Sequence, residues 1–280
     1  MDTTSRIGFM QGRLSEIVDN KIQAFPWNSW QEEFINANSL KFNLMEWTLD
    51  HENLTKNPLV DISKHTLIQK LCTENNIRIT SLTGDCFMQF PFWKYQGERQ
   101  KILKKQFDII LNSCAAFGIK IIVIPLVDNG KIENFNQEKE LRNFLVSRNN
   151  LLTEFKIQIG FESDFSPNKL LDFIQSFPSK NFGINYDMGN SASMGFDPIK
   201  EINTYGERII NVHVKDRIKK GPTIPLGEGD VKFIEVFKML SKSAYKGNFI
   251  IQGARDINND HIGILNTYKK FVSKLIKEYF

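Results

Sequence analysis

Arg208-Ile-Ile-Asn-Val-His-Val-Lys-Asp-Arg217, with Ile224-Pro-Leu-Gly-Glu-Gly-Asp230 a few residues further on, is the stretch that decides the fold of this sequence. Its apolar run predicts a buried strand that carries His213 at its carboxyl end. A charged loop with Lys215 and Asp216 follows, and a Gly-x-Gly-Asp turn leads into a helical pattern. We therefore expect chemistry at the end of this strand.

Three other predicted strands also end on a polar side chain suited to a site. Glu162, Asp187 and Gln252 each stand just after an apolar run. Eight such runs occur along the chain, at 6–10, 43–47, 77–82, 119–124, 157–161, 181–186, 209–214 and 248–251. Helical patterns alternate with them, at 31–38, 62–74, 99–117, 138–154, 168–177, 199–206, 231–242 and 262–279. This alternation predicts an α/β fold, a (β/α)8 TIM barrel, in which functional residues gather at the carboxyl ends of the strands.

Length and composition restrict the class of protein. The 280 residues carry no linker, so we predict one barrel domain over residues 1–280. The net charge of +4, from 36 basic and 32 acidic residues, is too even to indicate a nucleic-acid partner. Three cysteines without Cys-x-x-Cys spacing give no disulfide framework. The amino terminus lacks a signal peptide pattern, and no run approaches the about 20 apolar residues of a membrane span, so we expect a cytoplasmic protein.

Four motifs in the second half of the chain point to a family. They are Tyr186-Asp-Met-Gly-Asn190, His213-Val-Lys-Asp216, Pro225-Leu-Gly-Glu-Gly-Asp-Val231 and Tyr245-Lys-Gly-Asn-Phe-Ile-Ile251. Their occurrence together and in this order resembles the sugar phosphate isomerase/epimerase family, the xylose isomerase-like or AP endonuclease family 2 TIM barrels. The resemblance is nearest to the L-xylulose/L-ribulose 5-phosphate 3-epimerase and hexulose-phosphate isomerase type. The motifs are specific for the family and much less so for the substrate.

This resemblance implies a metal-dependent enzyme acting on a sugar or sugar phosphate. It implies one divalent cation (Mn²⁺, Co²⁺, Zn²⁺ or Mg²⁺) held by Glu162, Asp187, His213 and the residue at position 252. Oxygen ligands with a single imidazole suit such ions. In the epimerases of the family, one glutamate removes the proton α to the carbonyl, an enediolate forms, and a second glutamate returns a proton from the opposite face.

Position 252 departs from the family pattern, because the family has a glutamate there and this chain has Gln252. A glutamine can offer its amide oxygen to a metal, but it cannot accept a proton at any useful pH. Glu162 would then be the only base among the ligands. Aldose–ketose isomerisation is therefore favoured over true epimerisation, and an inosose-type dehydratase is a further alternative.

The far end of the substrate is assigned to charged residues around the same strand ends. The substrate-binding candidates are Lys215, Asp216, Arg217, Glu228 and Arg255. With the amides of Gly227 and Gly229 the cations could bind a phosphate or carboxylate. The alternative is that Asp216 and Arg217 pair with each other or with Arg255 to brace the rim. Asp230 is expected to cap a helix that begins at Val231.

Other interpretations of the site remain open at the level of sequence. Glu162, Asp187 and His213 could form a buried polar cluster without a metal, although three converging ionisable groups are costly without a cation. The loss of the second glutamate allows a non-catalytic sugar-binding protein, and exposed aromatic loops allow a homodimer. A trinuclear AP endonuclease site is excluded, because the chain has four histidines and only His213 stands at a strand end. We expect surface roles for the other three, His51, His65 and His261. Glu46, near the end of the 43–47 run, is expected to support the site residues.

Overall fold

The computed structural model of this protein describes residues 3–280, and its centre is a closed barrel of eight parallel strands. The order around the barrel is β1-β10-β7-β6-β5-β4-β3-β2, so neighbours in the chain are neighbours in the barrel. The strands are β1 (Ile7–Met10), β2 (Leu44–Thr48), β3 (Arg78–Thr83), β4 (Ile121–Leu126), β5 (Gln158–Ser163), β6 (Phe182–Asp187), β7 (Ile209–Val214) and β10 (Phe249–Ile251). The predicted (β/α)8 fold is confirmed.

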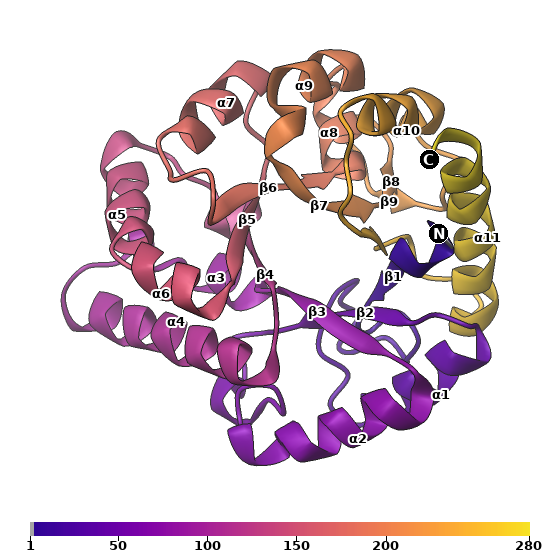
Figure 1. The fold of residues 1–280 in the computed structure, drawn as a ribbon, viewed down its shortest axis with the longest axis horizontal. Coiled ribbons are helices and arrows are strands. Elements are labelled where there is room, and N and C mark those ends of the chain that lie inside the picture. The colour runs from indigo at the N-terminus through magenta and orange to yellow at the C-terminus, as the bar shows by residue number, and fades with distance from the viewer. Residues whose placement is uncertain (1–2) are drawn as a thin grey trace.

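Helices form a ring around this barrel, and residues 3–6, where the described chain begins, contact α11 (Figure 1). The α-helices are α1 (Glu32–Ser39), α2 (His65–Asn75), α3 (Asp85–Gln89), α4 (Gly97–Phe117), α5 (Phe135–Val146), α6 (Asn149–Phe155), α7 (Pro167–Gln175), α8 (Met188–Met194), α9 (Pro198–Tyr205), α10 (Phe233–Lys242) and α11 (His261–Tyr279). Short 3₁₀ helices are η1 (Thr3–Arg6), η2 (Leu54–Lys56), η3 (Ile62–Lys64), η4 (Phe92–Lys94), η5 (Asp128–Gly130) and η6 (Gly206–Arg208). Gly118 ends α4 with a φ of 100°, the left-handed conformation that a glycine adopts without strain.

Aromatic side chains fill the layer between the barrel and the helices. Phe161 of β5 is fully buried and packs against Phe173 and Phe177 of the α7 region, with ring centroids 5.1 and 5.0 Å apart. Phe182 of β6 lies 5.0 Å from Phe177. Such rings contribute large apolar areas to burial, and edge-to-face packing adds to their attraction. The high phenylalanine content of the sequence therefore serves the core, which holds β5 and β6 in place.

A small apolar cluster of Met10, Leu44 and Ile250 packs between the barrel strands β1, β2 and β10. A Cβ at Gly8 of β1 would lie 2.8 Å from Ile250 and 2.9 Å from Leu44, which is closer than carbon atoms approach. The glycine therefore leaves room for these two fully packed residues. The polar residues Glu46, Asn185 and Asn211 are buried in other strands of the barrel.

A small hairpin follows β7 and projects beyond the barrel. Its strands are β8 (Asp216–Arg217) and β9 (Thr223–Ile224), which pair antiparallel. Fully buried Asp216 accepts hydrogen bonds from the amides of Gly227, Gly229 and Val231, at 2.8, 3.0 and 3.2 Å. One carboxylate thus holds the loop that carries the Gly-x-Gly-Asp motif.

Helix α8 begins directly after Asp187, because that side chain caps it. Two local predictions were wrong. The helix predicted over 138–154 is two helices, α5 and α6, divided near Ser147. Helix α10 begins at Phe233, and Asp230 does not cap it but accepts a hydrogen bond from the Lys219 amide at 2.7 Å. Strand β4 continues to Leu126 and so includes Pro125, which lies beyond the point where β3 pairs with β4.

Among residues 3–280, no helix combines the length and apolar character needed to cross a membrane. Met1 and Asp2, which begin the segment used for the signal peptide prediction, lie outside the described residues.

Candidate functional site

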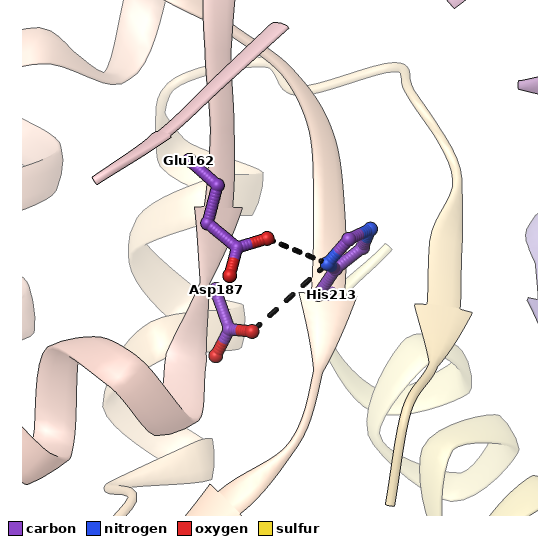
Figure 2. Close-up of side chains that lie close together, drawn as sticks. All are labelled: Glu162, Asp187 and His213. Carbon is purple, nitrogen blue, oxygen red and sulfur yellow. Dashed lines mark ion pairs between the residues drawn. The ribbon is translucent and has the colours of Figure 1, made fainter. Parts of the chain in front are cut away.

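Three predicted site residues converge at one end of the barrel. Glu162 of β5, Asp187 of β6 and His213 of β7 are buried, and one ligand atom from each lies within 4.8 Å of the others. His213 Nδ1 is 3.1 Å from Glu162 Oε2 and 3.9 Å from Asp187 Oδ2. Figure 2 shows both carboxylates pointing toward the same nitrogen of the imidazole ring. Adjacent parallel strands produce this convergence, because their carboxyl ends meet at one edge.

Glu46 of β2 fixes the other side of the His213 ring. Its Oε1 lies 2.7 Å from His213 Nε2, and both side chains are fully buried. Burial alone would lower the pKa of His213, but the charge of Glu46 and hydrogen bonds to Glu162 and Glu46 raise it to about 10. The contact with Glu46 thus occupies Nε2, and Nδ1 faces Glu162 and Asp187. A carboxylate behind a ligating histidine is the usual support for a metal ligand.

Two asparagines orient the Glu162 carboxylate. Asn185 Nδ2 donates to Oε2 at 2.9 Å, and Asn190 Nδ2 donates to Oε1 at 2.6 Å. Burial would raise the pKa of Glu162, but the hydrogen bond and charge of His213 and the charge of Lys215 keep it below its usual value. Glu162 is therefore an ionised carboxylate in a fixed orientation.

Asp187 divides its two oxygens between the fold and the site. Oδ1 accepts from the Asn190 amide at 2.8 Å and caps α8. Oδ2 pairs with Lys215 Nζ at 2.7 Å, and it is this oxygen that faces His213. The helix cap therefore determines which oxygen is presented to the site.

The residues present fit a divalent cation. His213 Nδ1 and the two carboxylates form an oxygen-rich donor set with one imidazole. Gln252 is buried at the end of β10, and its Oε1 has no hydrogen-bond partner among residues 3–280. A buried amide oxygen without a partner is costly, and a cation would satisfy it. The three carboxylates at His213, including Glu46, would be balanced by Lys215 and one divalent ion with a neutral imidazole.

A cavity of about 620 Å³ opens beside these residues. Glu162, Lys215, Arg217 and Gln252 line it, together with residues from the loops after β1 and β4 and from α3, which follows β3. The volume is in the range of small-molecule pockets.

The structure separates the five predicted substrate-binding residues. Lys215 and Arg217 line the cavity, whereas Asp216 holds the hairpin loop. Arg255 donates to the backbone carbonyls of Gly12 and Ser15, in the loop after β1. Glu228 is exposed and is not among the residues that line the cavity. The predicted pairing of Asp216 with Arg217 or Arg255 is not found among the described ion pairs of these residues.

Sequence reasoning missed several residues of the mouth. Asp85 lies at the start of α3 and lines the cavity. Asn211 donates to Asn185, and the two asparagines also donate to Glu46 and Glu162 respectively. The signal in the sequence is a single asparagine inside each of two apolar runs. The surface roles expected for two histidines were wrong, because His65 and His261 are only 7% and 9% exposed. His65 Nε2 contacts the Leu59 carbonyl oxygen at 2.8 Å, which accounts for its burial.

Comparison with known proteins places these features in a wider group. A family model described as "Xylose isomerase-like TIM barrel" matches residues 34–263. The chain is 24% identical to the L-ribulose-5-phosphate 3-epimerase UlaE of Escherichia coli O1:K1 over 237 residues, 80% of this chain and 81% of that protein. Its fold is similar to D-psicose 3-epimerase of Clostridium cellulolyticum H10, with a TM-score of 0.76, 13% identity and coverage of 97% and 99%. A xylose isomerase domain protein of Planctomyces limnophilus gives a TM-score of 0.74, 18% identity and 98% coverage of both chains.

Proposed function

This chain belongs to the xylose isomerase-like TIM barrel family, and from that premise we propose that it is a metal-dependent sugar or sugar phosphate isomerase or epimerase. Family and relatives make it an enzyme of the sugar epimerase and isomerase class. The finer proposal, with one divalent ion and Glu162 as the base, is supported by one observation above others. Glu162, Asp187 and His213 present ligand atoms within 4.8 Å of one another beside a cavity.

Glu162 is suited to remove the proton α to a carbonyl. It is ionised, and Asn185 and Asn190 hold its two oxygens in a fixed orientation. Proton removal gives an enediolate, whose negative charge needs compensation. A divalent ion bound by Glu162, Asp187, His213 and Gln252 would supply Lewis-acid polarisation of the carbonyl. Lys215, beside Asp187, adds a fixed positive charge at the same place.

Gln252 argues for a reaction with one base. The side chain is buried at the end of β10, where it can orient a ligand but cannot take up a proton. Proton transfer along one face of a cis-enediol, as in aldose–ketose isomerisation, requires only Glu162. Elimination of a hydroxyl by an inosose-type dehydratase also requires one base, so it is the second candidate.

The test measures metal content and proton exchange. Protein purified without chelator should hold about one equivalent of a divalent ion, and His213→Ala should hold little, because Nδ1 is lost. With Mn²⁺ or Co²⁺ added, the parent should exchange the α proton of a ketose with solvent deuterium, and Glu162→Gln should not. No metal in the parent, even after incubation with these ions, would contradict the proposal and favour a non-catalytic sugar-binding protein.

A further inference from the structure

Asp85 is an uncommitted carboxyl group in the mouth of the barrel. It is the first residue of α3, just after β3, and is only 7% exposed. It lines the same cavity as Glu162 and Gln252. Among residues 3–280, no hydrogen bond to its side chain and no ion pair is found. A buried polar group without a partner in the protein is suited to a ligand.

The chemistry of Asp85 suits a hydroxyl group. Burial, with the charges of Asp50 and Glu162, raises the pKa of Asp85 to about 8. A carboxyl group accepts hydrogen bonds through its oxygens in either protonation state, which matches the O–H donors of a sugar. Within the described part of the chain, Asp85 forms no ion pair, although the charge of Lys215 acts on it from a distance.

The cations of the cavity, in contrast, are mostly engaged by the protein. Lys215 pairs with Asp187 at 2.7 Å. Arg217 donates to the Gly221 carbonyl from Nε and Nη2, at 3.1 and 2.8 Å, and to Asn190 Oδ1 from Nη1 at 2.9 Å. Lys21 lies on the rim, where it is about half exposed and pairs with Asp19 at 3.6 Å. Exposed pairs of this kind contribute little.

The other groups predicted to bind an anion are engaged as well. Arg255 donates to the carbonyls of Gly12 and Ser15, away from the residues that line the cavity. The amides of Gly227 and Gly229 donate to Asp216 at 2.8 and 3.0 Å. A phosphate dianion taken from water needs several charge-assisted hydrogen bonds to replace its hydration. If these cations and amides were to bind a phosphate, the hydrogen bonds that hold the surrounding loops would have to break.

We infer, on the basis of the proposed function, that the substrate is an unphosphorylated sugar and that Asp85 binds one of its hydroxyl groups. The uncommitted carboxyl group and the engaged cations support the same substrate class. Asp85 is then a substrate-binding residue on the β3 side of the cavity, and Glu162 remains the base.

The first experiment compares free sugars with their phosphates. The Mn²⁺-loaded enzyme is given ketopentoses and ketohexoses, each with its terminal phosphate ester, and exchange of the α proton into deuterated water is followed. We expect kcat/KM for the best free sugar to exceed that of its ester by at least about tenfold. A higher value for the ester would overturn this inference and leave the proposed function standing. Exchange with neither class would overturn both.

The second experiment isolates Asp85. Asp85→Ala should raise KM for the free sugar by about 10- to 100-fold with a smaller change in kcat, and Asp85→Asn should recover part of the loss. Asp172→Asn, which removes an exposed carboxylate on α7, is the control and should match the parent. Monodeoxy analogues then identify the hydroxyl, because the one that lacks it should be insensitive to Asp85→Ala. Unchanged KM in a folded, metal-binding Asp85→Ala protein would overturn the assignment.

Discussion

Replacement of Glu46 by glutamine tests whether His213 is a supported metal ligand. In the parent, Glu46 Oε1 accepts from His213 Nε2 at 2.7 Å and also from Thr83, while Oε2 accepts from Asn211 Nδ2 at 2.8 Å. Every group around the carboxylate is therefore a donor. In Glu46→Gln, the new amide NH₂ must face either His213 and Thr83 or Asn211, so at least one hydrogen bond is lost and two donors face each other.

The size of the effect follows from the role of this contact. Loss of the group behind a ligating histidine typically weakens metal binding by about 10- to 100-fold, which is about 1.4–2.7 kcal/mol. Full burial of both side chains places the effect in the upper part of that range, because water cannot replace the lost contact. The dissociation constant for Mn²⁺ should therefore rise by about 100-fold.

Isothermal titration of metal-free protein with Mn²⁺ measures this constant directly, without the need for a substrate. Glu201→Gln is the matched control, since Glu201 is a buried carboxylate that accepts from Tyr186, Ser191 and Tyr205 and does not contact His213. It should bind Mn²⁺ as the parent does. A dissociation constant within threefold of the parent for a folded Glu46→Gln protein would refute the view that Glu46 orients a metal ligand.

Two further predictions concern stability. Asp216→Ala removes the acceptor of three amides from a fully buried position, so it should lower the free energy of unfolding by about 2–4 kcal/mol in denaturant titration, with a smaller loss for Asp216→Asn. An equal loss in the two variants would contradict this account of the loop. Burial raises the pKa of Glu33 to about 7, against hydrogen bonds from Gly12, Leu14 and Ser15. The folded state therefore binds this proton more tightly than the unfolded chain, and its stabilising effect is present below about pH 4 and lost as the pH rises through about 7. The melting temperature of the parent relative to Glu33→Gln should fall between pH 5 and pH 8, and a constant difference would contradict the sign.

The barrel itself could be predicted from the sequence because each strand has a local signal, a short apolar run. The apolar run that contains His213 predicts a strand over residues 209–214, and β7 has the same bounds. Parallel strands buried on both faces are continuous apolar runs, so their number and order follow from the pattern alone. The convergence of Glu162, Asp187 and His213 then follows from the topology, since strands β5, β6 and β7 are neighbours.

What the sequence could not predict are contacts between distant segments. The sequence predicts Asp216 as a site residue in a charged loop, and only the folded chain shows that three backbone amides donate to its side chain. Arg255 reads as a rim cation, but it meets carbonyls some 240 residues away in the chain. Such bonds depend on loop geometry, which has no periodic signature.

The double use of Asp187 also sets a rule for engineering this scaffold. Because one oxygen of Asp187 starts α8 and the other faces His213, a longer or uncharged side chain there would disturb both a helix and a candidate metal ligand. Libraries aimed at new substrates should keep residues 187–190 constant. Diversity is better placed in α3 and in the loop after β4, which line the cavity without supplying any of the three candidate metal ligands.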